Sequence, residues 1–169
     1  MPARAFLAGR GARGVGLLAV LAAVLAPGDA AQNRKSGVSR ERLNPARLAA
    51  PSGYTHVLAV RGGKMVFVSG QVAADEKGNP VGKGDLKAQT TRVFENLRTA
   101  LLGAGAGLGD IVKMTTYVVN YRAEMLPMLR EVRSAFLGDV AVPTSTLVGV
   151  QALARPEYLI EIEVIAVVE

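Results

Sequence analysis

The stretch Leu159–Val168 (LIEIEVIAVV) is the strongest strand signal in the chain and constrains the fold more than any other segment. One of its alternating faces carries Ile162, Val164 and Ala166, and the other carries Glu161, Glu163, Ile165 and Val167. Because apolar side chains recur on both faces, both sides of this strand are expected to pack against something.

Other segments supply the partners of this strand. The runs 56–61 and 64–71 are β-branched and apolar, and Gly62-Gly63 between them predicts a tight hairpin. A Gly- and Pro-containing loop follows over 73–84, and helical spacing then begins at Asp85, a plausible N-cap. Further strands are predicted over 111–120 and 144–150, with a second helix over 123–137 between them. The order ββαβαββ predicts an α+β fold with two helices on one face of a five-stranded sheet.

Two helices cover only one face of such a sheet. The opposite face would then expose an apolar patch larger than monomers usually tolerate. We therefore expect the chain to associate with copies of itself through that face.

The N-terminal segment 1–31 is typical of a secretory signal peptide. Arg4, Arg10 and Arg13 precede the apolar block Val15–Ala26, and Pro27–Ala30 supplies a small-residue cleavage signature. The block of ~12 residues is shorter than the ~20 that span a bilayer, so no stable membrane insertion is expected after cleavage. We expect a secreted or periplasmic protein; the alternatives are a mitochondrial-type presequence, or a mistaken start site on a cytoplasmic protein. Residues 32–48 are polar and basic and are interpreted as a linker, leaving 49–169 as the folded domain.

The formal net charge of +6 suggests nucleic acid until the charges are located. All of the excess lies in residues 1–48, and 49–169 sums to zero, so no nucleic-acid partner is expected. The chain has no cysteine and a single histidine, His56. Thiolate zinc sites, iron–sulfur clusters, disulfides and multi-histidine metal sites are therefore excluded, and we expect no metal.

Several dispersed motifs carry a family resemblance. They are Ser69-Gly70-Gln71, Gly84-Asp85 with Gln89, Gly109–Lys113, Pro143–Val148 and Ile160–Glu163. Together they resemble the RidA (YjgF) family over about residues 50 to 169. The resemblance implies a chorismate-mutase-like fold, assembled as a homotrimer with pockets between subunits. It also implies a hydrolase that needs no cofactor and converts reactive imines and enamines, such as 2-aminoacrylate, to keto compounds and ammonia.

The resemblance also implies roles for individual residues. Glu161 would be the catalytic group that holds the water, whereas Glu163 on the same strand face would be structural. Tyr54, Ser69, Ser145 and Thr146 would bind substrate, although Tyr54 could instead pack a subunit edge and Ser69 tie down a strand end.

One position departs from the family pattern. Deaminases of the family carry an arginine that clamps the substrate carboxylate where this chain has Ser145. Arg122, in a loop that borders the family's pocket, is a candidate substitute cation. The alternative function is a non-catalytic trimer that binds a small metabolite or acts as a chaperone-like surface, keeping the pocket without the deaminase activity.

Overall fold

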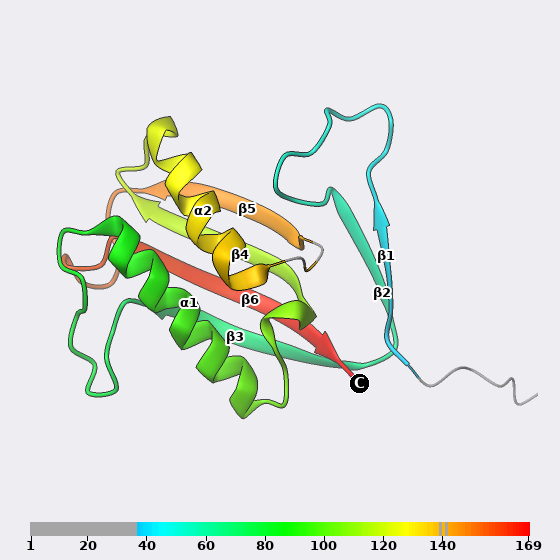
Figure 1. Ribbon diagram of the computed structural model, residues 1–169, viewed down its shortest axis with the longest axis horizontal. Helices are drawn as coiled ribbons and strands as arrows, with labels where there is room; N and C mark the ends of the chain where they lie inside the picture. The colour runs from blue at the N-terminus through cyan, green and yellow to red at the C-terminus, as the bar shows by residue number, and fades with distance from the viewer. Residues whose placement is uncertain (1–36, 139, 141) are drawn as a thin grey trace, which may run out of the picture. The chain divides into compact units, whose positions relative to one another are not determined.

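The computed structural model describes residues 37–169 except 139 and 141 (Figure 1). The predicted signal peptide, 1–31, and the first residues of the predicted linker lie outside the described part. No helix in the described part is long and apolar enough to cross a membrane.

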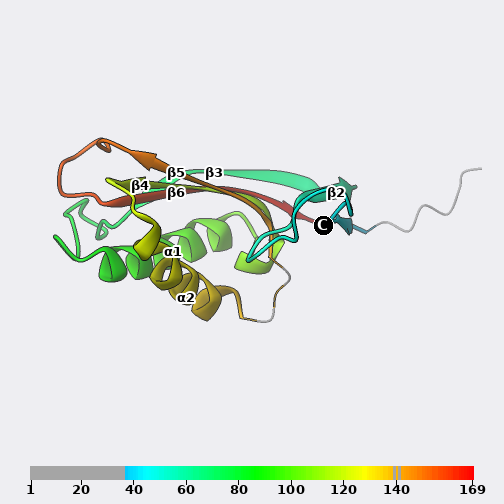
Figure 2. The same ribbon diagram turned by 90° about the horizontal axis from the view of Figure 1, so that it is seen from above.

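The main sheet has four strands in the order β3-β6-β4-β5. Strands β3 (Lys64–Val72) and β4 (Ile111–Val119) both pair antiparallel with β6 (Ile160–Val168), and β5 (Thr144–Val150) pairs parallel with β4. Helices α1 (Leu86–Gly103) and α2 (Leu126–Leu137) both lie on one face of this sheet (Figure 2). Short 3-10 turns at Leu108–Asp110 and Ala123–Met125 precede β4 and α2. The predicted α+β fold with two helices on one face is therefore confirmed.

The N-terminal part of the domain differs from the prediction in two ways. Residues Ser39–Leu43, interpreted as linker, form strand β1, which pairs antiparallel with β2 (Val57–Arg61) in a separate two-stranded sheet. The predicted hairpin between 56–61 and 64–71 is wrong, because β2 pairs with β1 while β3 pairs with β6. Gly62 and Gly63 do turn the chain at positive φ, but they connect two sheets.

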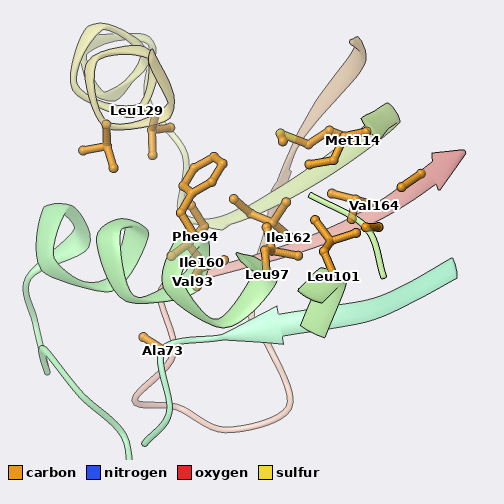
Figure 3. Close-up of a cluster of buried hydrophobic side chains, with 14 of the residues drawn as sticks. Ala73, Val93, Phe94, Leu97, Leu101, Met114, Leu129, Ile160, Ile162 and Val164 are labelled. Atoms are coloured by element: carbon orange, nitrogen blue, oxygen red, sulfur yellow. The ribbon is translucent and has the colours of Figure 1, made fainter. Parts of the chain in front are cut away.

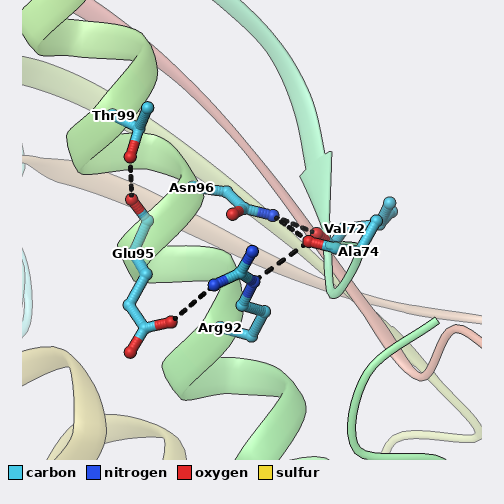
Figure 4. Close-up of polar contacts among 6 residues, drawn as sticks. All are labelled: Val72, Ala74, Arg92, Glu95, Asn96 and Thr99. Carbon is cyan, nitrogen blue, oxygen red and sulfur yellow. Dashed lines mark hydrogen bonds and ion pairs between the residues drawn. The ribbon is translucent and has the colours of Figure 1, made fainter. Parts of the chain in front are cut away.

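Helix α1 begins where its sequence predicts, directly after Asp85. The side chain of Asp85 accepts a hydrogen bond of 3.0 Å from the Ala88 backbone N–H and so caps the first turn. Farther along, the Asn96 side-chain amide donates to the carbonyls of Val72 and Ala74, at 2.9 and 3.0 Å (Figure 4). Arg92 donates to the same Ala74 carbonyl and pairs with Glu95 (Figure 4). These bonds satisfy backbone carbonyls where β3 ends, and they tie α1 to the sheet.

The hydrophobic core lies between the helices and the sheet (Figure 3). Its largest fully buried apolar side chains are Phe94, Leu97, Leu101, Met114, Ile160, Ile162, Val93 and Val118. Phe94 of α1 also stacks on Phe136 of α2, with ring centroids 5.2 Å apart. The two helices are thus joined to each other as well as to the sheet.

The other face of the sheet, here called the open face, is covered by no helix in the described part of the chain (Figure 2). Near one edge it exposes Met65 and Phe67, which are 57% and 70% accessible. Its centre is polar, as the next section describes. The two-sided apolar pattern predicted from the sequence therefore holds at the edge of this face and gives way to charged and hydroxyl groups in the middle.

Candidate functional site

The residues predicted to form one site fall on opposite faces of the main sheet. Ser145 on β5 is paired with Met114, which is buried in the core beneath the helices. Glu161 on β6 is paired with Tyr117 on the open face. Since side chains alternate between faces, Ser145 points to the helix side, whereas Thr146 and Glu161 point to the open face. Within one subunit, a small molecule does not reach both Ser145 and Glu161.

On the open face, five polar side chains from three neighbouring strands form what we call the open-face cluster. They are Lys113, Tyr117, Thr146, Glu161 and Glu163. The Tyr117 hydroxyl donates to Oε1 of Glu163 at 3.1 Å, and Lys113 Nζ donates to the Thr146 hydroxyl at 2.5 Å. Glu163 is therefore engaged by a neighbour, as its predicted structural role requires.

The carboxylate of Glu161 lies over a glycine in the adjacent strand. The register between β3 and β6 shifts between Val68 and Gln71, which marks a β-bulge that contains Ser69 and Gly70. A Cβ placed on Gly70 would overlap Oε1 of Glu161. The absence of a side chain at Gly70 thus makes the space that the Glu161 carboxylate occupies.

Ser69 lies in the same bulge and is exposed. Its carbonyl accepts a hydrogen bond of 3.1 Å from the Gln71 side chain. Ser69 therefore borders the position of Glu161, and the bulge that includes it gives Glu161 its room.

In the open-face cluster, the pKa of Tyr117 is raised above its usual value. The hydrogen bond to Glu163 is the main cause that raises the pKa of the Tyr117 phenol, with smaller contributions from partial burial and from the charges of Glu163 and Glu161. A raised pKa keeps the phenol neutral at physiological pH. Tyr117 therefore acts here as a hydrogen-bond donor beside two carboxylates.

On the other side of the sheet, the helices and β-strands line an open pocket of about 330 Å³, here called the helix-side cavity. Apolar side chains dominate its wall, including Phe94, Met114 and Ile162 (Figure 3). Its polar lining consists of Ser52, Tyr54, Thr90, Thr116, Tyr121, Arg130, Arg133 and Ser145. This combination is typical of a binding pocket for a small organic molecule.

Two of the predicted site residues, Tyr54 and Ser145, line the helix-side cavity. Thr55, next to Tyr54, bonds to the carbonyls of Val142 and Pro143 just before β5, which holds this loop beside the cavity. Tyr54 also packs edge-on against His56, with ring centroids 5.1 Å apart. The His56 ring in turn bonds to the Ala49 carbonyl at 2.8 Å.

Arg122, the predicted substitute cation, is exposed and follows β4. The helix-side cavity is lined in this region by its neighbour Tyr121. The structure therefore joins Arg122 neither to Ser145 nor to Glu161. Within residues 37–169, no group of three or more His, Cys, Asp or Glu side chains could hold a metal ion.

Comparison with known proteins identifies the family. Residues 44–168 match the family model described as Endoribonuclease L-PSP. The chain is 33% identical to the RutC family protein YjgH of Escherichia coli, over 76% of this chain and 95% of that protein. It is 28% identical to a 2-iminobutanoate/2-iminopropanoate deaminase of Dermatophagoides farinae, over 66% of this chain and 84% of that protein. The crystal structure of a Rid family protein, YyfB of Yersinia pestis, matches with a TM-score of 0.72 and 39% identity, covering 76% of this chain and 98% of that one.

The chain belongs to the Endoribonuclease L-PSP family, the family of the RidA (YjgF) proteins. The prediction made from the dispersed motifs is thereby confirmed. The matched region of this RidA-family chain includes both the open-face cluster and the helix-side cavity.

Three side chains that the structure places at the open-face cluster or the helix-side cavity of this RidA-family protein were not predicted from the sequence. Tyr117 could have been found from its alternation within 111–119, which places it opposite the buried positions of β4. Arg130 and Arg133 stand one turn apart on α2. An arginine pair at this spacing is ordinary on a solvated helix surface, so nothing in the sequence sets these two apart.

Proposed function

We propose that this RidA-family chain hydrolyses reactive imines and enamines to keto compounds and ammonia, without a cofactor. The observation that carries the proposal is the position of Glu161. Its carboxylate lies in the space above Gly70, beside the neutral donor Tyr117. A relative named as a 2-iminobutanoate/2-iminopropanoate deaminase supports the choice of reaction.

The chemistry requires a water, a base and a donor. Glu161 accepts a proton from the water as the new C–O bond forms at the imine carbon, while the imine nitrogen takes up a proton, giving a carbinolamine. The amino nitrogen then takes the proton held by Glu161, the C–N bond breaks and ammonia leaves, and the carbinolamine hydroxyl gives its proton to the Glu161 carboxylate as the C=O bond forms. An enamine enters the same sequence after protonation at carbon.

We further propose that the working form is a homotrimer assembled through the open face. Met65, Phe67 and Val148 are exposed large apolar side chains on this face. A second subunit placed there would bury them and exclude bulk water from the open-face cluster, where charge interactions then strengthen. Light scattering at micromolar concentration tests this directly, because a monomeric mass would overturn the proposed assembly.

The hydrolysis is tested with imino acids generated by an amino-acid oxidase. We expect Glu161→Gln to slow hydrolysis by about 100-fold or more, the range typical of a lost acid–base group. Glu124→Gln is the matched control, because Glu124 is an exposed carboxylate after β4 and lies outside the open-face cluster. A folded Glu161→Gln variant that retains wild-type activity would overturn the proposal.

Ser145 favours a second candidate function, a binding protein without turnover. The family resemblance implies a carboxylate-binding arginine at this position, and here the serine lines the helix-side cavity on the face away from Glu161. The diagnostic variant is Ser145→Arg. If wild type and Glu161→Gln are equally inert while Ser145→Arg gains activity, the natural protein is a binder.

Export remains part of the proposal, carried by the Arg-rich, apolar segment 1–31. Expression of the full chain in a Gram-negative host, followed by mass determination of the mature protein, tests it. We expect cleavage near Ala31 and recovery from the periplasm. An intact N-terminus in the cytoplasmic fraction would contradict it.

A further inference from the structure

We propose that Glu163 is a positioning residue for the hydrolysis: by accepting the hydrogen bond of Tyr117, it keeps the phenol proton away from the carboxylate of Glu161. This inference rests on the proposed function, in which Glu161 takes the proton of the attacking water. It gives Glu163 an effect on the reaction, whereas the family resemblance implies only a structural role for this residue.

Tyr117 lies beside two carboxylates and has one proton to donate. It is the cross-strand partner of Glu161 in the register of β4 with β6, and Glu163 lies two positions farther along β6 on the same face. Both the direct partner and the diagonal neighbour of a residue in a sheet are within reach of an aromatic side chain. Because a phenol has a single O–H, a hydrogen bond to one carboxylate leaves the other without this donor.

In the structure, the phenol proton goes to Glu163. The Tyr117 hydroxyl donates to Oε1 of Glu163 at 3.1 Å. In the part of the chain that the structure describes, no hydrogen bond or ion pair reaches the carboxylate of Glu161. The adjacent residues of β3, 69–72, are uncharged. The oxygens of Glu161 are therefore left for the water that the proposed hydrolysis requires.

The direction of this hydrogen bond matters because Glu161 acts as a base. A hydrogen bond donated to a carboxylate favours its ionised form, so the carboxylate takes up a proton less readily. The bond also occupies a lone pair that the attacking water needs. A phenol turned toward Glu161 would therefore slow the step in which the water loses its proton. Because the pKa of Tyr117 is raised, chiefly by its bond to Glu163, the phenol keeps its proton at neutral pH.

The other charged donor of the open-face cluster, Lys113, is not placed to compete. Its Nζ donates to the Thr146 hydroxyl at 2.5 Å. Its cross-strand partner on β6 is Ile165, whereas the partner of Glu161 is Tyr117. Among the donors of the cluster, the phenol is therefore the one in register with the proposed base, and the acceptor that holds the phenol decides whether the base stays free.

The test compares two substitutions of Glu163 in the hydrolysis of imino acids. Glu163→Ala removes the acceptor and lets the phenol turn to Glu161, so we expect kcat/KM at neutral pH to fall about three- to tenfold. The acid limb of the pH profile of kcat/KM should move to lower pH by about one unit. Glu163→Gln removes the charge but keeps an amide oxygen that accepts from the phenol, so it should lose less activity than Glu163→Ala.

A double-mutant cycle with Tyr117→Phe identifies the phenol as the cause. If Glu163 acts through Tyr117, then Glu163→Ala should change kcat/KM by less than about twofold in a protein that already carries Tyr117→Phe. A purely structural role for Glu163 would give the same loss with or without the phenol. Glu163 is exposed, so its removal should leave the protein folded. Glu124→Ala, which removes an exposed carboxylate outside the cluster, is the matched control and should hydrolyse imino acids like wild type.

Three results would overturn the positioning role of Glu163. They are a wild-type rate and pH profile in Glu163→Ala, equal losses in Glu163→Ala and Glu163→Gln, or the full loss from Glu163→Ala in the presence of Tyr117→Phe. Glu161→Gln tests the hydrolysis separately. If Glu161→Gln is slow and one of the three results is found, the proposed hydrolysis stands and the role of Glu163 fails. If Glu161→Gln is as active as wild type, the proposed hydrolysis itself fails, and the role of Glu163 fails with it.

Discussion

The two faces of β6 carry different kinds of chemistry on one strand. Toward the helices, Ile160, Ile162, Val164 and Ala166 are each at most 2% exposed. Toward the open face, Glu161 is half-buried and Glu163 is exposed, and both neighbour Tyr117 or Thr115 across the sheet. An alternation of period two therefore separates the residues that stabilise the fold from the residues proposed to react.

Each face of the sheet contains an exception to its general character, and the exception lies where function is proposed. The helix side is close-packed, yet it contains a cavity lined by two arginines. The open face has no helix over it in the described chain, yet it carries large apolar side chains beside its charged groups. Local conflicts of this kind concentrate at functional sites, because packing alone would have removed them.

The largest expected difference between the faces is in the effect of removing a phenylalanine. Phe94→Ala empties a buried site that stacks on Phe136, and we expect the free energy of unfolding to fall by about 3–5 kcal/mol. Phe67→Ala, the same change at a 70% exposed position, should change it by less than about 0.5 kcal/mol when the chain is kept dilute. Urea denaturation measures both values.

Phe94→Ala and Phe67→Ala should also respond differently when the protein concentration is raised. If the open face is the assembly surface, the cost of Phe67→Ala grows with concentration, because the associated form buries this ring. The cost of Phe94→Ala should not depend on concentration in this way. Equal costs for the two variants in dilute solution would break the distinction between the faces.

The next largest effect is expected at a buried polar group on the helix side. Gln89 of α1 is fully buried, donates to the carbonyls of Gly82 and Glu157, and accepts from the Leu159 N–H. Gln89→Leu leaves these backbone groups without partners, so we expect a loss of about 2–4 kcal/mol in the free energy of unfolding.

Thr99→Ala on the same helix is the control for Gln89. Its hydroxyl bonds to the Glu95 carbonyl at an exposed position, so its removal should change stability by less than about 0.5 kcal/mol in urea denaturation. A Gln89→Leu variant as stable as wild type would show that apolar packing replaces the three hydrogen bonds.

A smaller effect on stability, with a large effect on function, is expected at Gly70. Gly70→Ala places a methyl group where the Glu161 carboxylate lies, and the resulting displacement should cost about 1–3 kcal/mol. It should also slow hydrolysis of imino acids to the same extent as Glu161→Gln.

Gly103→Ala is the matched glycine variant. A Cβ at Gly103 meets nothing within 4 Å, and the residue is helical, so this change should stabilise the protein by up to about 1 kcal/mol. Hydrolysis should be unaffected. Full activity in Gly70→Ala would show that the reaction does not need the Glu161 carboxylate at its position above Gly70.

The sequence predicted the strands of the main sheet and the two helices, but it did not predict which strands pair with each other. Periodicity located α1, α2 and the strands β3 to β6, because each has a buried or half-buried face that leaves an apolar repeat. Strand β1 (SRERL) leaves none, since only Arg40 among its residues is even half-buried. Adjacency along the chain predicted that β2 pairs with β3, but hydrogen bonding to β1 and β6 determined the actual partners.

For the candidate site, sequence motifs named residues but not the faces on which they lie. Alternation shows that Glu161 and Glu163 share a face. Whether Ser145 shares that face depends on the registers of β5 with β4 and of β4 with β6, which single strands do not encode. Arg130 and Arg133 line a cavity that exists only after α2 packs on the sheet, so their position at its wall could not be predicted from the sequence.

The smallest expected effect is a change in the pKa of Tyr117, on the open face, when Glu163 is replaced. The hydrogen bond to Glu163, and the nearby carboxylate charges, hold the pKa of this phenol above its usual value of 10.0. Glu163→Gln removes one of those charges, so the pKa should move down toward that value. Phenolate absorbance followed during alkaline titration reports the change, with Tyr117→Phe subtracted to isolate this residue among the four tyrosines.

Because the folded state holds the proton of Tyr117 more tightly, the hydrogen bond to Glu163 stabilises the fold fully at pH values below the unfolded pKa. This stabilisation is lost as pH rises through the folded pKa. A Tyr117 titration that is unchanged in Glu163→Gln would mean that the phenol and the Glu163 carboxylate do not interact, which would contradict the hydrogen bond on which the raised pKa of Tyr117 depends.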